Sequence, residues 1–417
     1  MTSFQTQTQV ARGERAVRAV FYGRGKPLFL LYLRTALLTL VTLGIYRFWA
    51  RTRIRKYIWS ATSVADDTFE YTGTGLEKLL GFLLAVVVLA IYLGLVQTAL
   101  AFFGLFLFAE PESEAQVIAQ LAAFYISFLA VLPLIFFAQY RARRYRLART
   151  RWRGIRFGMD LAAWGYAARA LGHLLLTLVS FGLLWPRQSF WLEKYMTDRS
   201  YYGEARFHQG GRWTELYPGL AHVGLGCLIL LLSGVVIATT EAAWLGGLGV
   251  LLGLVWFLVG LVHYRVFAFN YLTRYKRLDE TVTFQARLTT REVLRHILLG
   301  ALAIIGASLA GAFLVSMVFG VTMGIGLATG GLETQSLDAP PAFLGVISVL
   351  TVLVYVGVIL LIGGLWLVLV TQKVIGSAVN SFTITNVAGL DKIRQRAGDQ
   401  GADAEGFADA LDIGGGI

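Results

Sequence analysis

Cysteine, proline and histidine are scarce in this sequence of 417 residues, which contains one cysteine, seven prolines and five histidines. Because Cys227 is the single cysteine, an intrachain disulfide is excluded and cysteine usage does not indicate the redox compartment. The histidines have no spacing typical of a metal site, and the sequence contains no HExxH, GxSxG or Walker motif. We therefore predict no metal, no cofactor and no catalytic residues, and we do not expect an enzyme.

Basic residues are absent from three long windows, although the chain carries a net charge of +12. No lysine or arginine occurs in residues 79–140, 213–264 and 296–372. With 56% hydrophobic residues and a mean hydropathy of +0.63, the chain has the composition of a membrane protein. Nucleic-acid-binding proteins spread their basic residues over one folded face, so this alternation argues against a nucleic-acid partner.

Each window is long enough for two membrane-spanning helices, because a span needs about 20 apolar residues. We predict three helical hairpins, with spans at residues 79–108, 117–138, 219–239, 242–264, 297–329 and 342–371. The hairpin tips contain only acidic charges, whereas arginines and lysines lie at the hairpin feet. By the positive-inside rule, the feet and the C-terminus are cytoplasmic.

An internal duplication includes the first apolar segment. LLTLVTLG at residues 37–44 aligns with LLTLVSFG at residues 175–182. The same ungapped alignment pairs Lys56 with Lys194 and Phe69 with Phe207. The second copy lies between two cytoplasmic hairpin feet. A single span there would place the two feet on opposite sides of the membrane, so it does not fit. We predict re-entrant or interfacial helices at residues 28–46 and 166–185. A true span stays open for the first copy if the N-terminus lies outside.

The predicted fold is an all-α polytopic membrane protein with three transmembrane hairpins, two duplicated re-entrant or interfacial helices and small cytoplasmic β-hairpins. The chain divides into a flexible N-terminal tail (1–20), a first repeat (21–138; re-entrant helix 28–46, basic and β connector 47–78, hairpin 79–138), a second repeat (139–264; Arg-rich connector 139–165, re-entrant helix 166–185, connector 186–218, hairpin 219–264), a third hairpin unit (265–390; connector 265–296, helices 297–329 and 342–371, β segment 373–390) and a disordered C-terminal tail (391–417).

A phenylalanine in a strand-like context follows each exit from the membrane, at Phe69, Phe157, Phe207, Phe284 and Phe382. Three of these are followed eight residues later by a glutamate, namely Glu77, Glu215 and Glu292. A carboxylate in the first turn favours a helix N-terminus, so we expect a short strand at each phenylalanine and a helix that starts near each glutamate.

Polar side chains recur at the same places in the two duplicated helices. Their spacing of i, i+4, i+7 puts them on one helical face, and they are Thr35, Thr39 and Thr42 in the first copy and His173, Thr177 and Ser180 in the second. The simpler interpretation is that the hydroxyl groups bond to their own helix or to a neighbouring helix. The functional interpretation is a polar path, as in discontinuous transporter helices.

Eight arginines occur within sixteen positions after the first hairpin. They are Arg141, Arg143, Arg144, Arg146, Arg149, Arg151, Arg153 and Arg156. The positive-inside signal alone explains such a cluster. A sharper hypothesis is contact with anionic lipid headgroups on the cytoplasmic side, because basic residues gain about 1 kcal/mol each near an anionic leaflet.

The motifs of the first copy resemble a known family. FYGRGKPLFLLYLRTALLTLVTLGIYRFWARTRIRKY, FEYTGTGLEKLLG and RTRWRGIRF resemble the YjgN family of bacterial inner-membrane proteins, which is defined by a domain of unknown function. In the last motif Arg149 replaces the usual asparagine, and the second copy departs from the pattern at LLWPRQSFW. The resemblance implies a multi-pass protein of the inner membrane and no particular activity.

Two functional classes remain on this evidence. The first is a transport or channel-like protein whose path the polar stripes line. The second is a lipid-interacting or scaffolding protein that acts through its arginine-rich cytoplasmic surface. The predicted spans contain no Asp or Glu in their interiors, which counts against proton- or sodium-coupled transport. The oligomeric state is not indicated.

Overall fold

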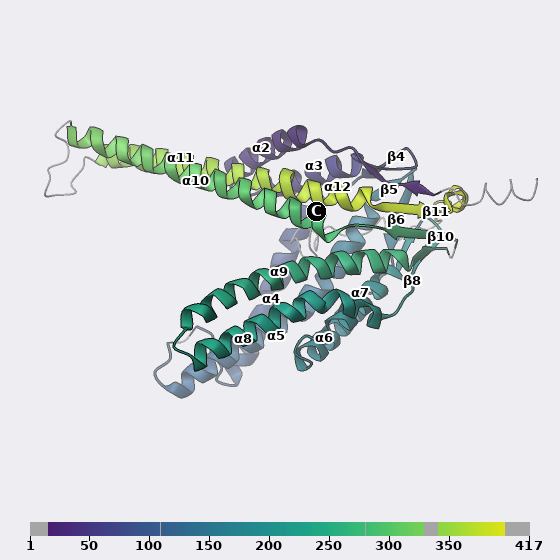
Figure 1. The fold of residues 1–417 in the computed structure, drawn as a ribbon, viewed down its shortest axis with the longest axis horizontal. Helices are drawn as coiled ribbons and strands as arrows, with labels where there is room; N and C mark the ends of the chain where they lie inside the picture. The colour runs from purple at the N-terminus through teal and green to yellow at the C-terminus, as the bar shows by residue number, and fades with distance from the viewer. Residues whose placement is uncertain (1–15, 109, 280, 329–340, 397–417) are drawn as a thin grey trace, which may run out of the picture. The chain divides into compact units, whose positions relative to one another are not determined.

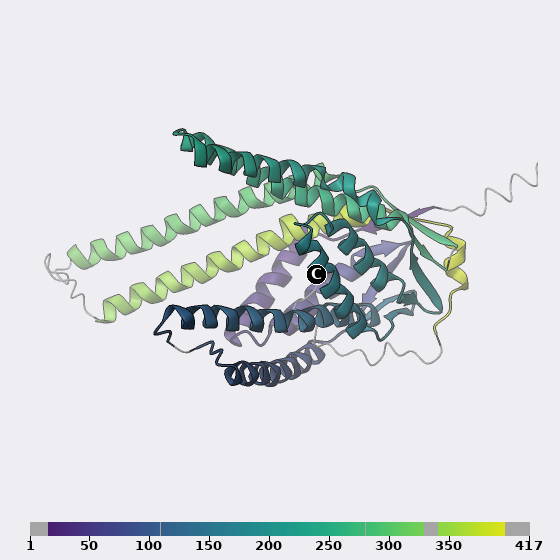
Figure 2. The same ribbon diagram turned by 90° about the horizontal axis from the view of Figure 1, so that it is seen from below.

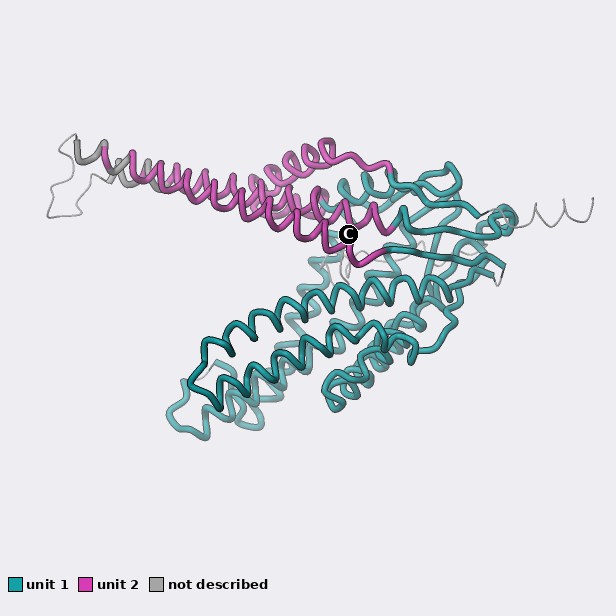
Figure 3. Tube along the Cα trace, in the orientation of Figure 1, with its two compact units in different colours: residues 1–21, 51–288, 379–417 teal, residues 22–50, 289–378 magenta. Residues whose placement is uncertain are grey.

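The computed structural model describes residues 16–108, 110–279, 281–328 and 341–396. The chain forms two compact units (Figure 3). Unit 1 comprises Met1–Phe21, Arg51–Leu288 and Val379–Ile417, and unit 2 comprises Tyr22–Ala50 and Thr289–Ala378. The units do not follow the predicted repeats, because the first re-entrant segment groups with the third hairpin.

The strands of unit 1 form one sheet. They are β1 (Val17–Arg18), β2 (Val20–Phe21), β3 (Thr62–Val64), β4 (Asp67–Tyr71), β5 (Thr150–Trp152), β6 (Ile155–Met159), β7 (Ser200–Tyr202), β8 (Ala205–Gln209), β9 (Lys276–Leu278), β10 (Val282–Ala286) and β11 (Phe382–Thr385). Their order is β1-β11-β10-β9-β8-β7-β6-β5-β4-β3-β2, and the neighbouring strands are antiparallel. Only Ala19 separates β1 from β2, so the two ends of the order meet in the chain and the sheet is barrel-like.

The fold is mostly helical, as predicted, but its β-hairpins join in one continuous sheet, which the all-α assignment with small β-hairpins did not include. Each hairpin edge pairs with the next hairpin, which satisfies backbone groups that an isolated hairpin leaves unpaired. The strand of residues 17–18 also lies inside the N-terminal tail predicted as flexible. Likewise, the 3-10 helix η3 (Val387–Lys392) extends into the tail predicted as disordered.

The phenylalanines predicted to mark strands all lie in strands, and their rings follow one another across the sheet. The ring centroids are 6.2 Å apart for Phe69 and Phe157, 6.5 Å for Phe157 and Phe207, 6.1 Å for Phe207 and Phe284, and 5.6 Å for Phe284 and Phe382. They pack against one hydrophobic cluster of residues from β3, β5, β7, β8, β9, β10, β11 and η3. The sheet therefore encloses a packed core.

The helices of unit 1 are α4 (Gly75–Phe102), α5 (Glu114–Ala148), α6 (Ala163–Val179), α7 (Trp185–Thr197), the 3-10 helix η1 (Trp213–Leu220), α8 (Ala221–Thr239) and α9 (Ala243–Arg274). In this unit the sheet lies at one end, and α4, α5, α8 and α9 extend away from it (Figures 1 and 2). Unit 2 contains α2 (Gly25–Val41), α10 (Thr290–Ala328), α11 (Pro341–Leu365), the π-helix η2 (Trp366–Thr371) and most of α12 (Gln372–Asn380). The helix α3 (Arg47–Ser60) begins in unit 2 and continues in unit 1.

Within the described residues, six helices are long and apolar enough to cross a membrane, in agreement with the six predicted spans. They are Gly75–Phe102, Glu114–Ala148, Trp213–Thr239, Ala243–Arg274, Thr290–Val321 and Val349–Asn380. The predicted glutamates lie in first helical turns, at Glu77, Glu215 and Glu292. Thr74 and Thr289 accept hydrogen bonds from the backbone N–H groups of Glu77 and Glu292, which is the geometry of an N-cap.

Both helices predicted as re-entrant end earlier than expected. α2 ends at Val41 rather than at residue 46, and α6 ends at Val179 rather than at residue 185. In each case the helix ends in a Schellman motif. Leu43 and Phe181 adopt positive φ (49° and 52°), and the backbone N–H groups of Gly44 and Gly182 donate to the carbonyl oxygens of Thr39 and Thr177. A second helix then begins, so each copy is a helix–turn–helix element. We call residues 25–60 the first element and residues 163–197 the second element.

Candidate functional site

The predicted arginine cluster runs from the end of α5 into β5 and β6. Several of its members bind groups elsewhere in unit 1. Arg149 Nε lies 3.1 Å from a carboxylate oxygen of Glu77, and Arg153 contacts Asp67 at 2.5 Å and Asp391 at 2.8 Å. Arg149 and Arg153 thereby contact α4, β4 and η3, so part of the predicted lipid-contact surface has a structural role.

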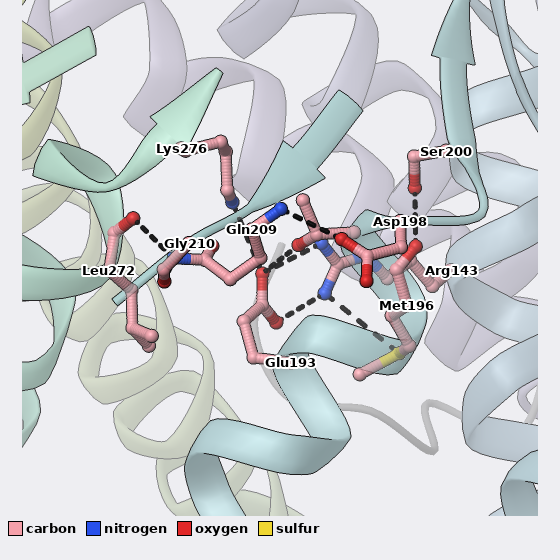
Figure 4. Close-up of polar contacts among 10 residues, drawn as sticks. Arg143, Glu193, Met196, Asp198, Ser200, Gln209, Gly210, Leu272 and Lys276 are labelled. Carbon is pink, nitrogen blue, oxygen red and sulfur yellow. Dashed lines mark hydrogen bonds and ion pairs between the residues drawn. The ribbon is translucent and has the colours of Figure 1, made fainter. Parts of the chain in front are cut away.

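Glu193 on α7 is the centre of a charge cluster that the sequence analysis did not identify (Figure 4). Arg143 donates to both carboxylate oxygens of Glu193, at 2.6 and 2.9 Å. Lys276 Nζ and Thr197 Oγ1 donate to Glu193 Oε1, at 3.2 and 3.0 Å. The ion pairs connect α5, α7 and β9, and the Glu193 side chain is 23% exposed.

Two opposing effects act on the pKa of Glu193. Burial by itself raises the pKa, but the charges of Arg143 and Lys276 and their hydrogen bonds outweigh burial, so the pKa lies far below that of an ordinary glutamate. A signal for this site exists in the sequence. Glu193 falls on Arg55 in the register of the duplication, so the charge at this position is reversed between the two copies.

A second group of polar contacts attaches the end of α7 to β8 and α9 (Figure 4). Lys194 Nζ lies 2.9 Å from Asp198 and donates to the carbonyl oxygen of Gln209 at 2.6 Å. Asp198 accepts a hydrogen bond of 2.7 Å from the backbone N–H of Gln209. The buried Gln209 side chain donates to the carbonyl oxygens of Gly210 and Leu272. These bonds hold the C-terminal end of the second element on the sheet.

A hollow of about 450 Å³ lies where the end of α5 meets the start of α6. Its lining consists of Phe137, Tyr140, Arg141, Arg144, Leu161, Ala162, Ala163, Trp164 and Gly165. We call it the Arg141 hollow. The Arg141 guanidinium is 5.7 Å from the centroid of the Phe137 ring, and the buried Arg144 donates to the carbonyl oxygen of Met159 at 3.1 Å. Among the described residues that line the hollow, none is acidic.

The start of α6 differs from the starts of the helices that carry first-turn glutamates. Gly165 stands eight residues after Phe157, where the other three sites have Glu77, Glu215 and Glu292. Ala162, the residue before α6, makes no side-chain cap hydrogen bond. The positive end of this helix dipole therefore faces the Arg141 hollow without a carboxylate from its own first turn.

The predicted polar residues of the second element contact side chains of α7. Arg187 Nη1 donates to His173 Nδ1 at 3.1 Å, and Thr177 Oγ1 donates to Gln188 Oε1 at 2.8 Å. Ser180 Oγ accepts a hydrogen bond of 3.0 Å from the backbone N–H of Leu184 in the turn. Residues 187 and 188 lie in the predicted connector of residues 186–218, so these partners were not predicted from the sequence.

The predicted polar residues of the first element bond mostly to their own helix. Thr35 Oγ1 donates to Leu31 O at 2.9 Å, Thr39 Oγ1 to Thr35 O at 2.7 Å and Thr42 Oγ1 to Leu38 O at 2.8 Å. Thr42 Oγ1 also accepts from the backbone N–H of Tyr46 at 2.9 Å, as Ser180 does from residue 184. This stripe belongs to unit 2, whereas the second stripe belongs to unit 1.

The described residues include no group of three or more His, Cys, Asp or Glu side chains that could hold a metal ion. His222 and His263 come together in unit 1, with ring centroids 4.7 Å apart, but His296 lies in unit 2 and contacts Ser377. The site therefore consists of arginines, aromatic rings and the polar contacts of the second element.

Comparison with known proteins identifies the family. A family model described as a bacterial protein of unknown function (DUF898) matches residues 16–410. The chain belongs to this family. It is similar to the inner membrane protein YjgN of Salmonella typhimurium (strain LT2), with 27% identity over 150 residues, and to YjgN of Escherichia coli (strain K12), with 28% identity over 147 residues. Each match covers 35% of this chain and 33% or 32% of the relative, so the chain spans about a third of the relatives it matches. No solved structure matches the chain.

The DUF898 match confirms the resemblance identified from the motifs of the first copy. The relatives are inner-membrane proteins by name, and the six apolar helices of this chain fit a multi-pass membrane protein.

Proposed function

We propose that the six apolar helices span the inner membrane and that the two helix–turn–helix elements enter it only in part from the cytoplasmic side. The turn tips support this topology, because Leu43 is 94% exposed and Phe181 is 97% exposed. An exposed apolar tip between two helices is suited to insertion into the hydrocarbon core from the cytoplasmic side. The arginine cluster and the C-terminus are then cytoplasmic, as the positive-inside rule requires.

Cysteine labelling tests this topology. In a Cys227→Ala background, Ser113→Cys lies between two predicted spans and Ser60→Cys lies at the exposed C-terminal end of α3. We expect an impermeant thiol reagent added from the periplasmic side to label only the protein with Ser113→Cys. Labelling of Ser60→Cys from that side would contradict the proposed orientation.

We propose that the protein binds anionic lipid headgroups in the Arg141 hollow. The observation that carries this proposal is a hollow lined by two arginines and no acidic residue, at the positive end of α6. Trp164, which is 63% exposed, and Phe137 supply aromatic surface of the kind found at membrane interfaces. A phosphate would occupy the position that Glu77, Glu215 and Glu292 fill at the three helix starts with a first-turn glutamate.

Lipid-dependent stabilisation tests this binding. The melting temperature of the purified protein in detergent is measured with added phosphatidylglycerol and with added phosphatidylcholine. We expect stabilisation by phosphatidylglycerol, and we expect Arg141→Gln to weaken its binding about fivefold, which corresponds to about 1 kcal/mol per basic residue. Arg153→Gln is the matched control, because Arg153 pairs with Asp67 and Asp391. Equal binding by Arg141→Gln and the wild type would refute the site.

A second candidate function is transport along the second element. The contacts of His173 with Arg187 and of Thr177 with Gln188 favour it, because they place polar groups between the two helices of an element with an apolar outer face. Release of an encapsulated anionic dye from proteoliposomes tests it. Dye release by the wild type that His173→Leu abolishes would support transport of soluble anions.

A further inference from the structure

We infer that the second element provides a track along which anionic lipid headgroups cross part of the bilayer, so that the protein translocates lipids between leaflets. This inference rests on the proposed binding of headgroups in the Arg141 hollow and names the substrate class of the second element. It requires a polar track that begins at the hollow, sufficient length, a surface for the acyl chains and a positive charge. Each of these is present in α6 and α7.

The track follows one face of α6. It begins at Gly165, which lines the Arg141 hollow and whose carbonyl oxygen accepts a hydrogen bond of 3.0 Å from Arg169 Nη1. His173, Thr177 and Ser180 continue at intervals of four, four and three residues, which keeps them on the same helical face as Arg169. Polar groups therefore follow one another from the hollow to the turn.

The length of α6 suits such a track. The helix has 17 residues, and a rise of 1.5 Å per residue makes it about 25 Å long. The hydrocarbon core of a bilayer is about 30 Å thick. A helix that begins at the headgroup level can therefore carry polar side chains through most of the core if it is only slightly tilted.

The remaining surface of α6 is apolar and exposed. Leu175, Leu178 and Val179 are 60, 63 and 80% exposed, and they lie between the positions of the polar residues. Acyl chains can pack against this surface while the headgroup follows the polar face. An amphipathic surface of this form fits a lipid, which is itself amphipathic, better than it fits a soluble ion.

The charge of the track selects anionic headgroups. Arg187 on α7 contacts His173, and Arg169 lies with its guanidinium 4.8 Å from the centroid of the Tyr195 ring. α6 contains no Asp or Glu. A phosphate without a compensating ammonium group is therefore attracted to Arg169 and Arg187, whereas a zwitterionic headgroup brings a positive charge that these arginines repel.

The first element lacks these features at the equivalent positions. In the register of the duplication, Leu31, Trp49 and Ala50 occupy the places of Arg169, Arg187 and Gln188. The hydroxyl groups of Thr35 and Thr39 donate to carbonyl oxygens of their own helix. The first element is therefore an internal control that has Arg34 in α2 but no arginine at the positions of Arg169 and Arg187.

The experiment measures lipid translocation in proteoliposomes. Vesicles contain a trace of phosphatidylglycerol with a fluorescent label on an acyl chain, and dithionite bleaches the label in the outer leaflet. We expect the wild-type protein to make the inner-leaflet label accessible faster than in protein-free vesicles. We expect the double variant Arg187→Leu, Thr177→Val to lower the translocation rate about tenfold, which corresponds to a barrier increase of about 1.4 kcal/mol. We expect Arg187→Lys alone to translocate lipid at close to the wild-type rate, because lysine keeps the positive charge.

The matched control is Thr35→Val with Thr39→Val in the first element, which we expect to translocate at the wild-type rate. Thr177→Val alone keeps the test informative if the double variant unfolds. A wild-type rate equal to that of protein-free vesicles, or an unchanged rate in the Arg187→Leu and Thr177→Val variant, overturns the inference. Equal rates for labelled phosphatidylcholine overturn the selectivity for anionic headgroups.

Binding of phosphatidylglycerol in detergent separates the inference from the proposed function. Binding that depends on Arg141 without translocation overturns the inference alone. Absence of both binding and translocation overturns both.

Discussion

Thr39 and Thr177 hold equivalent positions in the two helix–turn–helix elements, but their hydroxyl groups have different partners. Thr39 donates to the carbonyl oxygen of Thr35 in its own helix, whereas Thr177 donates to Gln188 in the next helix. The turn itself is the same, because Thr42 and Ser180 each accept the backbone N–H four residues later. The two elements thus share a turn and differ in what joins their helices.

The same contrast appears where each second helix meets the rest of the protein. Glu193 pairs with the side chains of Arg143 and Lys276. Arg55 at the equivalent position donates to Tyr71 Oη at 3.1 Å, and its guanidinium lies 5.3 Å from the centroid of the Tyr71 ring. Both side chains are held by specific partners, although their charges are opposite. Equivalent positions of the two elements can therefore carry opposite charges when the surrounding elements supply matching groups.

The largest effect is expected for Glu193→Ala. Removal of the carboxylate leaves Arg143 and Lys276 close together without their shared partner. We expect a loss of stability of about 3 kcal/mol, which is at the lower end of the cost of breaking a buried ion pair, because the site is partly exposed. The measurement is the melting temperature in detergent at neutral pH. Glu193→Gln is the control for side-chain volume and should lose most of the same stability. An unchanged melting temperature in both variants would show that the cluster does not stabilise the protein.

Acidification tests the same cluster without a mutation. Because the folded-state pKa of Glu193 is lowered, its contribution to stability is fully present above the pKa of an unfolded glutamate, about 4.3, and is lost as the pH falls through the folded-state pKa. The difference in melting temperature between the wild type and Glu193→Gln should therefore shrink as the pH falls below about 4. A constant difference down to the lowest pH at which the protein folds would contradict the lowered pKa.

Arg55→Met should have the next largest effect. It removes the hydrogen bond to Tyr71 and the contacts of the guanidinium with the rings of Tyr71 and Trp59. We expect a loss of about 2 kcal/mol, because the side chain is buried and its partners are aromatic. The melting temperature measures this loss. Arg53→Met is the control on the same helix, since Arg53 is an exposed residue. A larger loss for Arg55→Met than for Glu193→Ala would reverse the comparison.

Equal effects are expected where the two elements are alike. Thr42→Ala and Ser180→Ala each remove a hydroxyl that accepts a backbone N–H in the turn, so each should destabilise the protein by about 1 kcal/mol, as the loss of a helix cap does. Melting curves of the two variants make the comparison. If only one variant is destabilised, the two turns do not depend on the hydroxyl in the same way.

The smallest difference is expected between Thr177→Val and Thr39→Val. The first variant loses a hydrogen bond between helices and should cost about 0.5 kcal/mol, whereas the second loses a bond within one helix turn and should cost less. The two melting temperatures, measured side by side, distinguish the cases. A larger cost for Thr39→Val would mean that its hydroxyl has a role beyond its own helix.

Features that depend on neighbouring residues were predictable from the sequence. The six apolar helices follow from composition, and the strands at Phe69 and Phe207 and the helix starts at Glu77 and Glu292 follow from local patterns. Gly44 and Gly182 were a visible signal of the turns after the early helix ends, because each has a positive φ that glycine adopts readily. These features involve residues within one or two turns of one another.

Features that depend on distant pairing were not predictable in the same way. Closure of the sheet requires Val17 to pair with Ile384, and the roles of the arginines depend on partners such as Glu77 and Glu193 that lie far away in the chain. The arginine cluster therefore looked like one surface in the sequence. In the structure, some of its members hold the fold together and Arg141 and Arg144 line a hollow.

By itself, the sequence determined the membrane character, the number of apolar helices, the recurrence of the LLTLV motif and the places of the strand phenylalanines, because hydropathy and short-range spacing are properties of neighbouring residues. Only the tertiary structure decided that the strands join in one barrel-like sheet, that Glu193 unites Arg143 and Lys276, and that the polar stripe of the second element meets Arg187 and Gln188. The physical reason is that hydrogen bonds and ion pairs form between whichever groups the fold brings within about 3 Å, whatever their separation in the chain.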